Sequence, residues 1–466
     1  MRRRERFLAT VGALLLVSGC SLAPKYARPG APVPPALPAE GEAGPGEQAP
    51  AVAPWREFVT DARLRSVVEM TLANNRDLRT AVLNAERVGA FYRIQRAELY
   101  PSIGASAGVQ VSRVPESVAG EGEAYTSHPY SLSVGLTSWE LDLFGRIRSL
   151  KEQALNEYLA AQQVAAATQT SLIAATATTY LALAADAEAR GLSEATLGAQ
   201  RQTLDMIQKS REAGVASDLD IRQAQTQVEG ARALVARYTG LVELDRHELE
   251  LLAGRPIPPE LLPDSLGGVA PLQAVAGGMP SEVLLRRPDI MAAEYQLKGM
   301  NASIGAARAA LFPRISLTAA VGLVSPDLSG LFQGSAAAWS IAPQLAAPIF
   351  NAGALKANVE ATRLARDAAV AQYEKAIQAA FREASDALAL RTSLVEQRDA
   401  EAALVTALEE TYRLSEARYK AGIDGYLGVL VAQRALFAAQ QALVGVRLAE
   451  QQNLVNLYKV LGGGVS

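Results

Sequence analysis

The sequence predicts a mainly α-helical protein with a small β part and an internal duplication. Long stretches are rich in Ala, Leu, Gln, Glu and Arg and lack proline, which favours helix. Short segments such as FPRISLTAAVGL (312–323) alternate apolar and polar residues, which favours strands. The same series of features occurs twice, about 210 residues apart, so the chain reads as two copies of one design.

The composition excludes several classes of function. The chain has 466 residues, of which 49% are hydrophobic, and a formal net charge of −3. It has no long basic run and therefore no electrostatic footprint for nucleic acid. A single cysteine, Cys20, excludes internal disulfides and cysteine-based zinc sites, so its position has to explain it.

The N-terminus has the pattern of an exported lipoprotein. Residues 1–19 are predicted to be a signal peptide, because a basic stretch precedes an apolar stretch too short to span a bilayer. VSGC (17–20) resembles a bacterial lipobox, in which Cys20 is acylated and becomes the new N-terminus. Ser21 follows the cysteine, which in such lipoproteins resembles an outer-membrane destination. The alternative is a secretory signal followed by an incidental free cysteine.

The remaining chain divides into a tether, two repeats and a linker. Residues 20–54 are dense in Pro, Gly, Ala and Glu and are predicted to be an extended, acylated tether. The repeats cover 55–254 and 281–466, and the linker 255–280 between them carries Pro and Gly punctuation. No segment after the signal holds an uninterrupted apolar run of about 18 residues, so we expect no transmembrane helix in the mature chain.

Matching motifs define the two repeats. LYPSI (99–103) corresponds to LFPRI (311–315), and the helix break at Gly214 corresponds to the break at Gly422. Each repeat also carries two alternating segments joined by a loop rich in Gly, Ser, Pro and acids, which predicts a β-hairpin. The chain is thus expected to supply four strands, each with an apolar and a polar face: 103–111, 130–137, 312–323 and 339–345.

The rest of each repeat is predicted to be long helix. Arg146 to Ala213 contain no proline, and Gly191 is the expected point of any interruption. RRPD (286–289) predicts a helix start, with Pro and Asp in the first turn. The helices after the two Gly breaks keep a heptad spacing, with Asp245 and Asn453 among the seam positions, which predicts left-handed supercoiling against neighbouring helices.

Four amphipathic strands need an apolar medium on one side. For an exported, acylated protein that medium is the outer membrane, where only a closed barrel satisfies every backbone group. Membrane barrels begin at about eight strands, so at least two chains must share one barrel. Closure by itself does not separate two copies from three. The alternative is an ordinary small sheet packed on helices in the periplasm.

Several motifs together resemble one known family. These motifs are SWELDLFGR (138–146), SEVLLRRPDIMAAE (281–294), NASIGAARAALFPRISLTAAVGL (301–323) and NLYKVLGGG (456–464). They look like the NodT/OprM group of outer-membrane efflux lipoproteins, relatives of TolC. The resemblance implies a homotrimer with a twelve-stranded transmembrane β-barrel, continued by a long α-helical coiled-coil barrel. It also implies a passive exit duct for small toxic compounds or drugs, served by a periplasmic membrane-fusion adaptor and an inner-membrane pump of the RND type.

Two other functions remain as alternatives. A TolC-like type I secretion duct would export polypeptides through the same fold, although the lipobox favours the efflux group. A trimeric coiled-coil structural surface protein would explain the heptads but not the two repeated hairpins. An enzyme is not expected: GASAG (104–108) matches G-x-S-x-G, yet Ser106 falls inside an alternating strand and not on a nucleophile elbow. No cofactor or metal is expected beyond the lipid on Cys20.

The candidate functional residues lie at the turns between long helices. Arg418, Tyr419 and Asp424 flank the Gly422 break, and we expect them to form a polar constriction in which symmetry-related chains bond across the tip. The resemblance implies that this tip is the periplasmic gate and contacts the adaptor. For Asp218, beside the other break, we expect an N-cap of the following helix.

Overall fold

The computed structural model describes residues 21–38, 53–119, 122–273 and 279–463. The predicted signal peptide and Cys20 lie outside these residues. The chain divides into two compact units. Unit 1 comprises Met1–Gly30, Asn84–Gln162 and Ala292–Tyr373, and unit 2 comprises Ala31–Leu83, Gln163–Met291 and Glu374–Ser466.

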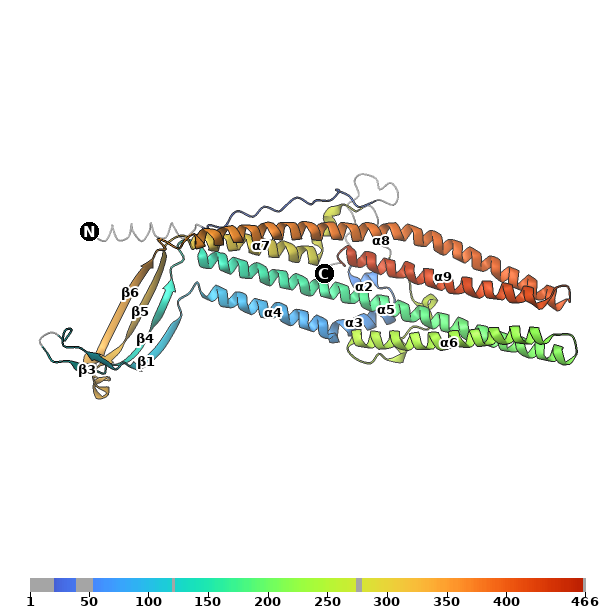
Figure 1. The fold of residues 1–466 in the computed structure, drawn as a ribbon, viewed down its shortest axis with the longest axis horizontal. Coiled ribbons are helices and arrows are strands. Elements are labelled where there is room, and N and C mark those ends of the chain that lie inside the picture. Colours follow the sequence, from blue (N-terminus) through green and yellow to red (C-terminus); the bar gives the residue numbers. More distant parts are fainter. Residues whose placement is uncertain (1–20, 39–52, 120–121, 274–278, 464–466) are drawn as a thin grey trace. The chain divides into compact units, whose positions relative to one another are not determined.

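Helices make up most of the described chain, as predicted (Figure 1). They are α2 (Trp55–Phe58), α3 (Ala62–Asn74), α4 (Arg76–Ala97), α5 (Arg146–Glu212), α6 (Asp218–Ala253), α7 (Pro288–Ala309), α8 (Ala354–Lys420) and α9 (Tyr426–Val460). α5 and α8 each run for 67 residues without a break, so Gly191 does not interrupt α5. One glycine costs only about 1 kcal/mol in a helix interior, which so long a helix tolerates. α7 begins at Pro288 with Asp289 in its first turn, as RRPD predicts.

Four strands form one antiparallel sheet in unit 1. Their order is β1 (Ile103–Val109), β4 (Tyr130–Glu140), β5 (Arg314–Ser325) and β6 (Ala337–Ala346). Each repeat supplies one hairpin, as predicted, and the β4–β5 pairing joins the two repeats. The loop expected between the first two strands contains a further short ladder, β2 (Ser112–Val114) with β3 (Tyr125–Ser127).

In unit 2, the helices form two antiparallel hairpins, α5–α6 and α8–α9. Their turns contain Gly214 at φ 76° and Gly422 at φ 72°, backbone conformations that glycine adopts without strain. The two turns lie at the same end of the unit (Figure 1). A small core there joins Ile207 and Ala224 of one hairpin to Tyr426 of the other, so the tips pack as one structure.

The main core of unit 2 also includes the predicted linker. Phe58 of α2 stacks on Tyr458 of α9 with ring centroids 4.2 Å apart, and both side chains are buried. Ile257, Leu266 and Leu272 of the linker belong to the same buried cluster. The linker is therefore rich in Pro and Gly, but its few apolar side chains still pack it against the core.

The described part of the predicted tether is extended but firmly attached. In unit 1, Arg28 donates two hydrogen bonds to the Glu294 carboxylate, at 3.0 and 2.8 Å. Asn301 Nδ2 donates to the Pro24 carbonyl at 2.8 Å. In unit 2, Leu37 is buried and its N–H donates to the Met279 carbonyl at 3.2 Å. These contacts were missed because the composition of a segment does not reveal its long-range partners.

Among the described helices, α9 is long and apolar enough to span a membrane by length and composition alone. Six of its buried apolar residues belong to cores shared with other helices of unit 2: Tyr426, Val429, Leu430, Val444, Val455 and Tyr458.

Candidate functional site

The sheet of unit 1 exposes large apolar side chains on one face. Val321 of β5 is 65% exposed, and Trp339, Ile341 and Leu345 of β6 are 77%, 63% and 63% exposed. The register places these residues at alternate positions, on the same side of the sheet. So many contiguous apolar side chains are not stable in water, so this face requires an apolar medium or a partner.

The opposite face is small and polar. Ser106 and Ser133, on neighbouring strands, have their hydroxyl oxygens 2.9 Å apart. Gly135 and Gly322 sit where β4 and β5 approach closely, because an added Cβ would lie 2.2 Å from a backbone oxygen of the other strand. Both placements agree with the alternation predicted from the sequence. Ser106 lies within β1, so the apparent hydrolase motif has no nucleophile elbow.

A β-bulge near the end of β4 keeps this separation of faces. The register shifts between Leu136 and Trp139, and Ser138 adopts a positive φ of 51°. The Ser138 N–H, displaced from the ladder, donates to Thr318 Oγ1 at 3.0 Å. As a result, Trp139 lies opposite Leu317 on the apolar face, and the following Glu140 turns to the polar face.

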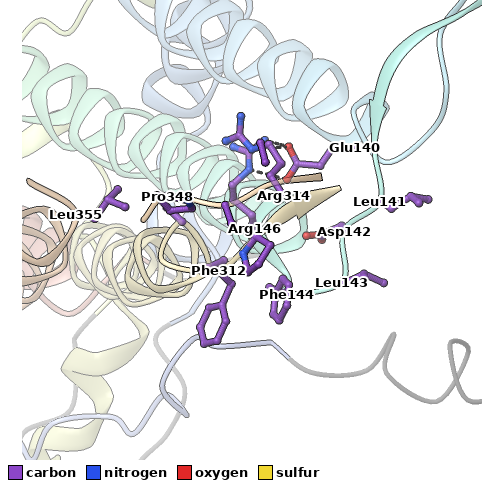
Figure 2. Close-up of a pocket in the computed structure, with 15 residues that line it drawn as sticks. Glu140, Leu141, Asp142, Leu143, Phe144, Arg146, Phe312, Arg314, Pro348 and Leu355 are labelled. Carbon is purple, nitrogen blue, oxygen red and sulfur yellow. Dashed lines mark hydrogen bonds and ion pairs between the residues drawn. The ribbon is translucent and has the colours of Figure 1, made fainter. Parts of the chain in front are cut away.

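Beyond the bulge, a pocket of about 440 Å³ lies where the strands meet the helices of unit 1 (Figure 2). Glu140 accepts two hydrogen bonds from Arg146, at 2.9 and 2.8 Å, and lies 3.3 Å from Arg314. Phe144 stacks on Phe312 with centroids 4.7 Å apart. These contacts fasten the end of β4 to the starts of α5 and β5.

Asp142 anchors the start of α5 at the same junction. Its carboxylate accepts from the backbone N–H groups of Ile147 and Arg148, at 3.2 and 2.9 Å. A carboxylate at a helix N-terminus satisfies unpaired donors and complements the helix dipole. The carboxylates of this pocket are thus bonded to structural partners, and the described chain holds no group of residues suited to bind a metal.

At the α8–α9 turn, Arg418 and Asp424 bond to each other within one chain. The guanidinium donates to both carboxylate oxygens, from Nε to Oδ2 and from Nη2 to Oδ1 at 3.2 Å. Both side chains are about half exposed. The hydrogen bonds from Arg418 hold the pKa of Asp424 below its ordinary value of 3.8. The pair closes the turn across Gly422 within one chain. The bonds expected between symmetry-related chains stay a prediction.

At the α5–α6 turn, Asp218 is not the N-cap, and this prediction is wrong. Ser217 is the N-cap, and it forms a capping box with Asp220. Asp218 lies in the first turn and accepts a hydrogen bond from Arg211 at 3.0 Å. Ser and Asp are both good caps, so composition alone could not place the helix start to one residue.

Tyr419 contributes to the small core at the tips. Its ring lies 5.5 Å from that of Tyr426, and both contact the cluster that joins the two turns. The structure therefore brings Arg418, Tyr419 and Asp424 together at one turn, as expected. Asp218 lies on the α5–α6 hairpin and forms an ion pair with Arg211.

Sequence reasoning missed the charged junction at Glu140, Arg146 and Arg314. A signal for it exists: the alternation of β4 changes phase between Thr137 and Trp139, which is typical of a bulge. The partner of Glu140 on β5 could not be read from the sequence, because the two residues are far apart in the chain.

An amphipathic sheet with two edges, together with long helical hairpins, defines a membrane-channel subunit. Comparisons with known proteins agree. The family model described as "Outer membrane efflux protein" matches residues 67–255 and 279–463. The chain therefore belongs to the outer membrane efflux protein family.

Individual relatives extend over nearly the full length. The antibiotic efflux pump outer membrane protein ArpC of Pseudomonas putida is 46% identical, covering 99% of this chain and 96% of its own. The toluene efflux pump outer membrane protein TtgC of the same species has the same identity and coverage. Among solved structures, the open state of the MtrE outer membrane channel of Neisseria gonorrhoeae is 36% identical with a TM-score of 0.86, covering 96% of this chain and 98% of that one.

Proposed function

We propose that this protein is the outer-membrane exit duct of a tripartite efflux system. It conducts small toxic compounds passively, and a periplasmic membrane-fusion adaptor and an inner-membrane pump of the RND type supply docking and energy. The observation that carries this proposal is the four-stranded sheet with one exposed apolar face. A duct needs no reactive group, and the protein is accordingly proposed not to be an enzyme.

The edges of the sheet support a shared barrel. In the described chain, β1 and β6 end the sheet on its two sides, and an open edge in lipid leaves backbone groups unsatisfied. Pairing β6 of one copy with β1 of the next removes both edges. Three copies would give the homotrimer that the family resemblance implies. Their strands together exceed the number of about eight at which membrane barrels begin.

Two registers of that pairing keep all seven residues of β1 paired within the ten of β6 and the apolar residues on one face. In the first register, Ala105 lies opposite Ile341 of the neighbouring copy. In the second register, Ala107 lies opposite Ile341.

The proposal places the protein in the outer membrane with a lipid on Cys20. The supporting observations are the lipobox pattern and the attachment of the following segment to α7, through Asn301 and Glu294. A segment held this way would limit the distance between the acylated residue and the sheet.

The helix tips support adaptor docking and a gate. Four apolar side chains at the two turns are more than 60% exposed: Val215, Leu219, Ile423 and Leu427. Such side chains suit contact with an adaptor. The exposed ion pair of Arg418 and Asp424, next to Tyr419, would then lie at the constriction, with Asp218 on the other hairpin of the tip.

The substrate class is inferred from the relatives. Their names assign antibiotics to ArpC and toluene to TtgC. Both are small molecules, and the polar face of Ser, Gly and Thr residues suits a water-filled path better than a path for one selected ligand. We therefore assign small toxic compounds as cargo and not polypeptides.

The test is conductance in planar bilayers with purified, detergent-folded protein, followed by drug and toluene susceptibility of a deletion strain. We expect discrete channels and a susceptibility that the gene restores. Absence of channel activity from an intact oligomer would show that the protein is a structural surface protein and not a duct.

A further inference from the structure

An aromatic contact closes the junction between the two repeats in unit 1. Phe144, which follows β4, stacks on Phe312, which precedes β5, with ring centroids 4.7 Å apart (Figure 2). β4 comes from the first repeat and β5 from the second, so this stack joins one repeat to the other. Because the chain is duplicated, the same two positions recur, as Phe350 after β6 and Tyr100 before β1.

Phe350 repeats the position of Phe144. Each of the two lies four residues after the last residue of its strand. Each is also followed by a glycine with positive φ that precedes a long helix, Gly145 at 76° and Gly353 at 88°. The glycine follows at once in the first repeat and two residues later in the second. Phe350 is 88% exposed and stacks on no ring of the described chain, so its position lacks the partner that Phe144 has.

Tyr100 repeats the position of Phe312 in the matching motifs LYPSI and LFPRI. The backbone turns in the same way at both positions: the Tyr100 N–H donates to the Ala97 carbonyl and the Phe312 N–H to the Ala309 carbonyl, each at 3.0 Å. The same turn therefore presents both rings at the start of a strand. Tyr100 is 64% exposed, and its ring likewise stacks on no other in the described chain.

Tyr100 and Phe350 belong to opposite edges of the sheet. The strand order is β1-β4-β5-β6, so two strands separate their positions within one chain and the two rings cannot stack there. In the shared barrel proposed above, β6 of one copy pairs with β1 of the next. The end of β6 then lies beside the start of the neighbouring β1, as the end of β4 lies beside the start of β5 within the chain.

The second register of edge pairing gives the two rings the same reach as the stack within the chain. In that register Ile103 lies opposite Leu345 of the neighbouring copy. Tyr100 lies three residues before Ile103, and Phe350 lies five residues after Leu345. In the stack within the chain, each ring lies four residues from the last pair of β4 and β5. The total length of chain between the rings is therefore equal in the two cases.

The second junction is apolar where the first is charged. Beside the stack within the chain, Glu140 bonds to Arg146 and lies 3.3 Å from Arg314. The three equivalent positions are small and uncharged: Ala346 at the end of β6, Ala354 at the start of α8 and Ser102 before β1. Ile349, next to Phe350, is 98% exposed. Large apolar side chains this exposed favour burial against a partner, and no ion pair competes with them here.

We propose that Phe350 of one copy stacks on Tyr100 of the next copy and closes the subunit boundary at the helix end of the sheet. The contact repeats between copies what Phe144 and Phe312 do within each chain, so aromatic pairs within chains and between chains alternate around the barrel. The ring centroids then lie about 4.5–7 Å apart, the usual range for aromatic pairs. This assignment rests on the shared barrel of the proposed function and names the second copy as the partner.

Thiol cross-linking of the purified, detergent-folded oligomer tests the contact, and the chain's own stack calibrates it. Tyr100→Cys with Phe350→Cys, and separately Phe144→Cys with Phe312→Cys, are treated with a short bismaleimide. We expect the first pair to join two copies and the second pair to join two positions of one chain. Only the first pair then gives covalent dimers and trimers on a denaturing gel. Each single variant controls for Cys20, the chain's own cysteine.

The outcomes separate this contact from the duct itself. An intact, conducting oligomer in which the calibrating pair reacts and the Tyr100–Phe350 pair does not overturns the contact and leaves the duct standing. A protein that forms neither oligomer nor channel overturns the contact and the shared barrel together. Cross-links between copies in a conducting oligomer support both.

Substitutions at the same positions provide a second test. Phe350→Ala and Tyr100→Ala should each lower by several degrees the temperature at which the oligomer dissociates in detergent, and the double variant should fall no further than the lower of the two. Phe350→Tyr keeps the ring and should keep the wild-type temperature. Phe332→Ala is the matched control, because it removes a 76% exposed phenylalanine from the loop between β5 and β6. Additive losses at Tyr100 and Phe350 would show that the two rings face separate surroundings, such as lipid, and would overturn the stack.

Discussion

Arg418 and Asp424 are six residues apart, and the glycine turn between them brings their charged groups into a two-point bond. An exposed ion pair of this kind contributes little to the stability of the fold. At a proposed gate its role is to position the turn. It holds the turn in one conformation and keeps both charges next to Tyr419. Removing either charge frees the turn without unfolding the helices.

Asp424→Ala is expected to raise the closed-state conductance several-fold, because the freed Arg418 no longer holds the turn. Single-channel recording measures this directly, and drug leakage in cells supplements it. Asp205→Ala, which removes an exposed ion pair from α5, is the matched control. Identical conductance in both variants and in wild type would show that the gate lies elsewhere.

The same pair predicts a pH dependence of the gate. Arg418 lowers the pKa of Asp424, so its contribution is present above the ordinary value of 3.8 and is lost only below the lowered value. We expect a closed-state conductance that is constant between pH 5 and pH 8 and rises only under stronger acid. A rise near pH 6 would point to another titrating group.

Within the sheet, close approach of β4 and β5 depends on two glycines. An added Cβ on Gly135 or Gly322 would lie 2.2 Å from a backbone oxygen of the facing strand. Because both are paired with residues of the other repeat, they determine whether the two hairpins join into one sheet. The bulge at Ser138 then determines which face Trp139 and Glu140 occupy.

Gly135→Ala is expected to destabilise the sheet by about 1–3 kcal/mol, the usual range for overpacking. The measurement is the urea midpoint of the detergent-folded protein, together with the fraction recovered as oligomer. Gly104→Ala is the control, because no atom lies within 4 Å of its added Cβ. Equal loss of stability in both variants would mean that the glycine-to-alanine change in strand conformational entropy causes the destabilisation, and not the close approach of β4 and β5.

For the assembled protein, the two registers of edge pairing can be told apart by cysteine cross-linking. Directly opposed residues in an antiparallel pair suit a disulfide, whose Cα atoms are about 4.4–6.8 Å apart. Ala105→Cys with Ile341→Cys should cross-link in the first register, and Ala107→Cys with Ile341→Cys in the second. Within one chain β1 and β6 are separated by two strands, roughly 14 Å, so any cross-link joins two copies.

We expect one of the two pairs to give a ladder of covalent species that ends at the trimer on a non-reducing gel. Ser106→Cys with Ile341→Cys is the control, since Ser106 faces the other side of the sheet. An intact oligomer without either cross-link would contradict the registers alone. Absence of any oligomer would contradict the shared barrel itself.

Much of this architecture could be predicted from local patterns. The alternation in FPRISLTAAVGL predicts the strand β5, and the proline-free stretches predict the helices α5 and α8. The two glycine breaks correspond to the turns at the helix tips. Periodicity succeeds in these cases because it depends on residues close together in the chain. The cap at Ser217 was misplaced by one residue for the same reason, since several residue types serve equally well there.

By itself, the sequence determined the fold class, the duplication and the polar and apolar faces of each strand, because these follow from local spacing and from self-similarity. Only the tertiary structure decided the strand order that joins the repeats, the burial of the linker and the docking of the tether through Glu294. Each of these brings together residues that are distant in the chain, and the energies that choose such contacts come from packing and desolvation in three dimensions.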